Sequence, residues 1–104
     1  MRIDMVVESS DLFETALAGV DVEASGHTFA AELVGALGHE FPEARLNIWF
    51  SPTRVASEEK LETHWDDGEV DPERLEEVEN RIHDRVRLLT RAIRDKGDWI
   101  VRIV

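Results

Sequence analysis

The sequence predicts an α+β fold, in which one domain spanning residues 1–104 forms a two-layer sandwich with two helices on one face of a small mixed sheet. Two kinds of hydrophobic periodicity indicate this class. Short segments alternate apolar and polar residues, as half-buried strands do, and two longer segments repeat apolar residues every three or four positions, as amphipathic helices do. The predicted order is β-α-β-β-α, followed by an apolar C-terminal segment.

The first strand is predicted at the start of the chain, where apolar residues alternate over residues 1–8. The segment that follows is compatible with either a loop or a short helix of Leu12, Phe13, Ala16 and Leu17. In the helical interpretation Ser10 is the cap and Gly19 ends the helix. An extended stretch is expected to lead from there to Ser25 and Gly26.

The first long helix is predicted from Thr28, because apolar residues then recur at every fourth position. Pro42 ends this helix, since proline cannot continue the hydrogen-bond pattern. Two glycines within the helix each cost about 1 kcal/mol relative to alanine. We therefore expect Gly35 and Gly38 to mark a close approach to a neighbouring element. The apolar stripe consists of Phe29, Leu33, Leu37 and Phe41.

Two further strands are predicted between the helices. Residues 46–50 alternate strictly and stop before Pro52, whereas residues 61–66 alternate more weakly. A hairpin between these two strands is the expected pairing. Trp49 points to the opposite face from Ile48, so it is expected to be exposed if helices cover only one face of the sheet.

The second long helix has the clearest signals. Asp71 is a suitable N-cap, Pro72 suits the first helical position, and Gly97 stands where a terminating glycine is favoured. These boundaries predict about 25 residues of helix. After it, residues 99–104 are almost wholly apolar and predict an additional C-terminal strand or a buried tail. The apolar stripe of the helix consists of Leu75, Val78, Ile82, Val86, Leu89 and Ile93.

Charge is distributed unevenly along the chain. Residues 1–79 carry 20 Asp and Glu against 5 Lys and Arg, whereas residues 80–104 carry 3 against 7. An acidic field of this kind repels nucleic acid and anionic membranes and attracts cationic protein surfaces. We therefore predict no direct nucleic-acid binding and no membrane association. Since only two of the twelve bases are lysine, adaptation to a salt-rich (halophilic) cell is an alternative cause of the acidity.

Several chemistries lack support in the sequence. The chain has no cysteine, which excludes disulfides and thiolate chemistry and fits a reducing cytoplasmic location. No apolar run approaches the roughly 20 residues that a membrane span needs. There is no nucleophile elbow and no phosphate-binding glycine loop, so neither an enzyme nor a cofactor is predicted.

Metal binding is also not predicted. His64 lies near Asp66 and Asp67, and Glu79 and His83 are one helical turn apart. Imidazole and carboxylate groups can hold a divalent ion, but neither spacing matches a known type of site.

The second half of the long helix forms a basic band. Such a band could contact nucleic acid, but the acidity of the rest of the chain favours ion pairs with its own carboxylates or with a second copy. An open sheet face carrying Trp49 is the candidate surface for a homodimer. The band consists of Arg81, Arg85, Arg87, Arg91, Arg94 and Lys96.

Three short motifs in this order of elements resemble the DinI family, small DNA-damage-inducible modulators of the RecA recombinase in the SOS response. They are Met1-Arg2-Ile3, Phe41-Pro42 followed by the strand at 46–50, and Gly97-Asp98-Trp99-Ile100-Val101 after a long amphipathic helix. The resemblance implies that the acidic last helix engages RecA by imitating the nucleic-acid backbone. The matching residues here are Glu73, Glu76, Glu77, Glu79 and Asp84.

This chain departs from the family pattern in two places. The last helix becomes basic in its second half, and the chain continues past Trp99. We expect a small non-enzymatic regulator, a RecA-like modulator or DNA mimic, that binds the cationic face of a nucleic-acid-binding protein. Residues 58–79 form an acidic stretch with eleven carboxylates and two bases. Trp65, which lies in this stretch, is a further candidate contact. The alternative is a structural or housekeeping domain whose acidity reflects salt adaptation and which self-associates through the open sheet face.

Overall fold

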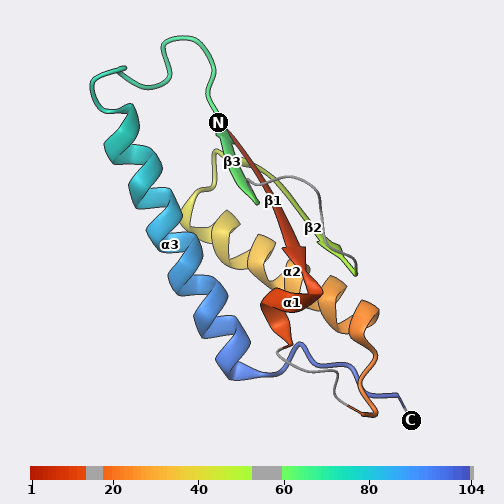
Figure 1. Cartoon of the computed structure of the whole chain (residues 1–104). Coiled ribbons are helices and arrows are strands. Elements are labelled where there is room, and N and C mark those ends of the chain that lie inside the picture. Colours follow the sequence, from red (N-terminus) through yellow and green to blue (C-terminus); the bar gives the residue numbers. More distant parts are fainter. Residues whose placement is uncertain (14–17, 53–59, 104) are drawn as a thin grey trace.

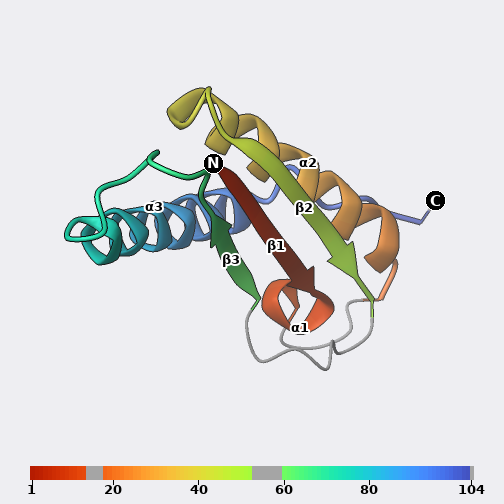
Figure 2. The ribbon, with the colours of Figure 1, turned by 90° about the horizontal axis from the view of Figure 1, so that it is seen from above.

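The computed structural model describes residues 1–13, 18–52 and 60–103, and it has the predicted α+β architecture. Helices α2 and α3 both lie on one side of a three-stranded sheet, as the two views in Figures 1 and 2 show. None of the helices in these three ranges combines the length and apolar character needed to cross a bilayer. The elements are β1 (Arg2–Glu8), α1 (Ser9–Leu12), α2 (Val22–Glu40), β2 (Arg45–Ser51), β3 (Leu61–His64) and α3 (Leu75–Lys96).

The sheet has the order β2-β1-β3, with β1 parallel to β2 and antiparallel to β3. The predicted hairpin between β2 and β3 is therefore wrong. Helix α2 connects β1 to β2 as a crossover, which makes them parallel neighbours and leaves the other edge of β1 for β3. The central position suits β1, because Val6 and Glu8 on one face and Ile3 and Val7 on the other are all buried.

One hydrophobic core lies between the sheet and the two long helices. Phe29, Leu33 and Leu37 of α2 are completely buried in it, which confirms the predicted apolar stripe of this helix. Helix α3 contributes Ile82 and Val86, which lie in the middle of its predicted stripe. The two helices thus cover the same face of the sheet with the residues that their periodicity predicts.

Helix α2 begins at Val22, six residues before the predicted start at Thr28. Asp21 is its N-cap, and the Asp21 side chain accepts a hydrogen bond of 3.0 Å from the backbone N–H of Ala24. The predicted extended stretch leading to Ser25 is therefore wrong. An aspartate cap satisfies one of the free N–H groups of the first turn, and this cap outweighs the poor helix propensity of the small residues after it.

The close approach lies at a different glycine from those predicted. A Cβ atom on Gly26 would stand 2.3 Å from Cγ of Phe50 on β2, so only glycine allows the helix to lie this close to the sheet. By contrast, a Cβ on Gly35 would meet nothing within 4 Å, and one on Gly38 would make only an ordinary contact. Gly26 therefore sets the distance between α2 and β2.

The short helix α1 has a different cap from the one predicted. Glu8 rather than Ser10 is the N-cap, and the Glu8 backbone N–H donates to the Asp11 carboxylate at 2.9 Å. The predicted helical residues Ala16 and Leu17 lie outside the described residues.

The start of α3 also differs from the prediction. Residues 72–74 form a turn, and the regular helix begins at Leu75 after Arg74. The Asp71 carboxylate accepts a hydrogen bond from the backbone N–H of Glu73 at 3.0 Å, so it stabilises this turn instead of capping the helix. The predicted end is confirmed, because Gly97 has a left-handed backbone with φ of 75°.

The C-terminal segment is a docked tail, and the predicted additional strand is wrong. Its only β pairing among the described residues is one isolated bridge between Arg102 and Val20. Trp99 is buried against the rings of Phe13 and Phe29, with ring centroids 5.4 and 5.2 Å away. The alternative interpretation as a buried tail therefore holds for Trp99.

We predict that Gly26→Ala destabilises the protein, because the added methyl group overlaps the Phe50 ring and forces α2 away from β2. Overpacking of this kind costs about 1–3 kcal/mol. Chemical denaturation would measure the free energy of unfolding. Gly35→Ala is the matched control, since the same change in open space should stabilise the helix by about 0.5–1 kcal/mol. Equal effects of the two changes would contradict the role given to Gly26.

Candidate protein-binding surface

Four carboxylates in the turn before α3 and in the first half of that helix form an exposed group, which we call the acidic surface: Glu73, Glu76, Glu77 and Asp84. The first turns of α3 extend beyond the sheet and beyond α2, which leaves this end of the helix accessible (Figures 1 and 2). No ion pair involves Glu73, Glu76 or Glu77 in the part of the chain that the structure describes. Their charges therefore face solvent without a compensating partner.

Glu79 differs from its acidic neighbours because it faces the sheet. One of its carboxylate oxygens accepts hydrogen bonds from the Thr63 hydroxyl at 3.0 Å and from the indole N–H of Trp65 at 3.2 Å. Glu79 and Trp65 are both half-buried, and Trp65 packs against the hydrophobic core. These two residues join α3 to the segment that follows β3. They therefore fix the position of the helix that carries most of the acidic surface.

Three residues of the basic band pair with carboxylates of the same chain. Arg85 binds Glu40 of α2 through two hydrogen bonds, and these hold the pKa of Glu40 below its ordinary value. Arg87 pairs with Asp84 at 2.6 Å, and Lys96 pairs with Asp98 at 3.0 Å. The predicted pairing within the chain is confirmed for these three bases. Asp84 is thus partly neutralised, so the net charge of the acidic surface comes mainly from its glutamates.

Trp49 lies on the face of the sheet that the helices leave uncovered, as predicted, and its side chain is 45% exposed. The pairing register places Val6 of β1 beside it. The other positions of this face on the same strands are Arg2, Asp4, Glu8, Arg45, Asn47 and Ser51. The open face is therefore mainly polar, with the exposed Trp49 beside the buried Val6 as its apolar part.

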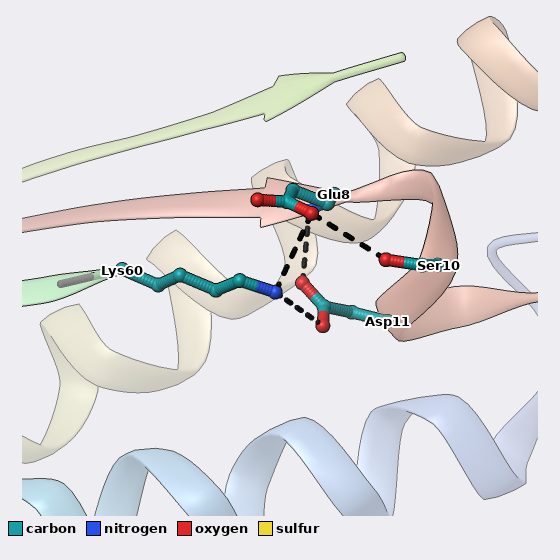
Figure 3. A network of polar contacts seen from close by, with 4 residues as sticks. All are labelled: Glu8, Ser10, Asp11 and Lys60. Carbon is teal, nitrogen blue, oxygen red and sulfur yellow. Dashed lines mark hydrogen bonds and ion pairs between the residues drawn. The ribbon is translucent and has the colours of Figure 1, made fainter. Parts of the chain in front are cut away.

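A polar network at the end of β1 ties three elements together (Figure 3). The Lys60 ammonium lies 2.9 Å from the Asp11 carboxylate of α1 and 3.5 Å from the buried Glu8 carboxylate. The Ser10 hydroxyl also donates to Glu8, at 3.4 Å. The hydrogen bond to Asp11 raises the pKa of Lys60, so the ammonium form is favoured. We interpret this network as structural, because it anchors α1 and the start of β3 to the central strand.

The structure also assembles a cluster that the sequence analysis missed. His64 lies beside Asp4 and Glu62, and their potential ligand atoms all lie within 4.8 Å of one another. It is the one such group of three in the described ranges, so neither Asp66 with Asp67 nor Glu79 with His83 forms one there. The only signal in the sequence was the alternation of residues 61–66, because the partner strand of β3 was not known.

No protein-family model matches this chain, and no curated protein or solved structure is significantly similar to it. The resemblance to the DinI family therefore stays a prediction.

The hydrogen bonds of Glu79 predict that this residue matters more for the stability of the fold than its exposed neighbour Glu77 does. Glu79→Ala should destabilise the fold by about 1–3 kcal/mol, because two half-buried donors lose their acceptor. Glu77→Ala, two residues away on the exposed side, should change the free energy of unfolding by less than about 0.5 kcal/mol. Urea denaturation of both variants would measure the difference. Similar values for the two would contradict the distinct orientations of these side chains.

Proposed function

We propose that this protein is a non-enzymatic regulator whose acidic surface binds the cationic, DNA-binding face of a nucleic-acid-binding protein. The observation that carries the proposal is the exposure of Glu73, Glu76 and Glu77, without ion-pair partners in the described ranges, at the projecting end of α3. Unpaired carboxylates on a rigid helix attract a basic surface without first having to break internal ion pairs.

The spacing of these charges supports imitation of a nucleic acid. At the helical rise of about 1.5 Å per residue, the four carboxylates of the acidic surface span about 16 Å with a mean separation of about 5.5 Å, whereas Glu73, Glu76 and Glu77 lie about 3 Å apart on average along the axis. One strand of DNA carries a charge about every 3.4 Å along its axis. Arg81 lies within this stretch and lowers the charge towards Asp84. We therefore place the centre of the contact at Glu73, Glu76 and Glu77.

The resemblance to the DinI family suggests RecA as the partner. Apart from the four-residue helix α1, the observed order β1, α2, β2, β3 and α3 agrees with the order that the resemblance implies. Glu79 and Trp65, which the sequence analysis included among the contact residues, take a supporting role in this proposal because their polar atoms bind each other. Asp84 contributes at the edge of the contact.

Neutralising the centre of the acidic surface tests this proposal. The triple variant Glu73→Gln, Glu76→Gln and Glu77→Gln should bind RecA filaments at least tenfold more weakly, a loss of about 1.4 kcal/mol. Surface plasmon resonance in low and moderate salt would measure it, since binding of this kind weakens as salt screens the charges.

The control for the triple variant removes the same charge elsewhere on the surface. Glu23→Gln, Glu43→Gln and Asp67→Asn change three exposed carboxylates outside α3. This control should retain affinity within about threefold, a difference of about 0.7 kcal/mol. If both triple variants lose affinity equally, only net charge matters and the proposed surface is wrong. If wild-type protein does not bind RecA, that partner is wrong.

The exposure of Trp49 favours a second candidate, a structural domain that self-associates through the open sheet face. In this case Trp49→Glu should convert a dimer to a monomer, because a carboxylate would be buried in the interface. Sedimentation equilibrium would measure the mass of each variant. Leu88→Glu on α3, which replaces another exposed apolar side chain, should leave the mass unchanged. A monomeric wild-type protein would exclude this candidate.

A further inference from the structure

The cluster of Asp4, Glu62 and His64 lies on the uncovered face of the sheet, away from the acidic surface. Asp4 of β1 pairs directly with Glu62 of β3, and His64 follows Glu62 by two residues, so all three side chains occupy the same face. Two backbone strands joined by hydrogen bonds hold the three side chains. Such a framework positions ligands more rigidly than a loop does.

The distances within the cluster match those of a metal site. The Nε2 atom of His64 lies 3.2 Å from Oδ2 of Asp4 and 3.5 Å from Oε2 of Glu62. Zinc binds imidazole nitrogen and carboxylate oxygen at about 2.0–2.2 Å, so two ligands at the tetrahedral angle are about 3.4 Å apart. The imidazole nitrogen thus lies from each carboxylate at the separation expected of two ligands of a common ion, which is also the distance of a direct imidazole–carboxylate contact, and potential ligand atoms of all three residues lie within 4.8 Å of one another.

The electrostatics of Asp4 give a second, independent reason. Its Oδ1 atom is buried and has no hydrogen-bond partner among the described residues, although a buried carboxylate oxygen normally has one. Asp4 and Glu62 are also like charges directly opposite each other on paired strands, an arrangement that destabilises a sheet. Arg2 and His64 both contact Oδ2 of Asp4, at 3.1 and 3.2 Å, so Oδ1 is the oxygen that lacks a partner among the described residues. A bound cation would satisfy this oxygen and neutralise the pair.

We propose that Asp4, Glu62 and His64 bind a first-row divalent cation such as Zn²⁺, which fastens β3 to β1. One imidazole with two carboxylates suits Zn²⁺ better than Mg²⁺, because Mg²⁺ prefers oxygen ligands. Water fills the remaining coordination positions, since none of the helices in the described ranges covers this face. Arg2 takes the role of an outer residue that orients a ligating carboxylate. The consequence is structural: β3 has four residues and, among the described strands, pairs with β1 alone, so the ion adds a further link between them.

Isothermal titration of the untagged chain with ZnCl₂ at pH 7.5 tests the proposal. We expect one saturable site per chain and an apparent affinity that falls at least tenfold in His64→Ala and in Asp4→Asn. The control is His39→Ala, which removes an exposed histidine of α2 outside the cluster and should bind Zn²⁺ like the wild type. Saturating Zn²⁺ should also raise the melting temperature of the wild type by several degrees, but not that of His64→Ala.

Three results would overturn the proposal. They are the absence of a saturable site, Zn²⁺ binding by His64→Ala with wild-type affinity, and equal affinity for Mg²⁺, which would mean that the carboxylates act only as a diffuse negative surface. Co²⁺ provides a second measurement, because its visible absorption reports coordination directly. His64 is largely at the surface, so His64→Ala should remain folded, and far-UV circular dichroism would verify this.

Discussion

The contact between Gly26 and the Phe50 ring determines how the helical layer lies on the sheet. Because glycine has no side chain there, α2 approaches β2 closely enough for Phe29, Leu33 and Leu37 to be completely buried. The next residue extends this effect to the C-terminal tail. The buried Ser25 hydroxyl accepts from the Val101 N–H at 2.7 Å and lies 3.3 Å from the Val101 carbonyl. Two adjacent small residues thus join the sheet, α2 and the tail.

The position of α3 follows from this arrangement. Its middle turns pack into the core through Ile82 and Val86, and Val78 of its first turn is partly buried against the same core. The start of the helix extends past the sheet (Figure 1) and is linked to the end of β3. The hydrogen bonds from Thr63 and Trp65 to Glu79 form that link. The same helix therefore has a fixed part and a projecting part, and the unpaired glutamates lie on the projecting part.

Periodicity predicted the elements but not their pairing. The stripes of α2 and α3 identified the core side of each helix, because burial repeats with the helical period. Alternation likewise placed Trp49 on the uncovered face. The order of strands could not be read in this way, since both edges of β1 are compatible with the same alternation. The cluster around His64 depends on that order, because Asp4 is far from Glu62 and His64 in the sequence and meets them only when β1 pairs with β3.

At the start of α2, local helix propensity predicted the wrong structure. Ser25 and Gly26 are poor helix formers, and in isolation they predict a turn. Each is required by a contact with a distant residue, Val101 for the serine and Phe50 for the glycine. Tertiary contacts of this kind leave no periodic signal in the sequence. The same limit explains the tail, whose apolar residues predict a strand although Trp99 is buried against aromatic rings instead.

The acidity of the chain has only a partial explanation in the stability of the fold. Acidic residues in the first turn of α3, Glu76 and Glu77, and basic residues in its last turn each interact favourably with the helix dipole, by about 0.3–1 kcal/mol. This effect declines within one turn, so it does not account for Asp66 and Asp67, which are exposed well before the helix. The pairing of Arg85, Arg87 and Lys96 with nearby carboxylates leaves the net charge unchanged, because each pair takes up one base and one carboxylate, and of these pairs only that of Arg87 compensates a member of the acidic surface, Asp84. The remaining negative charge is therefore not accounted for by packing of the core or by the helix dipole.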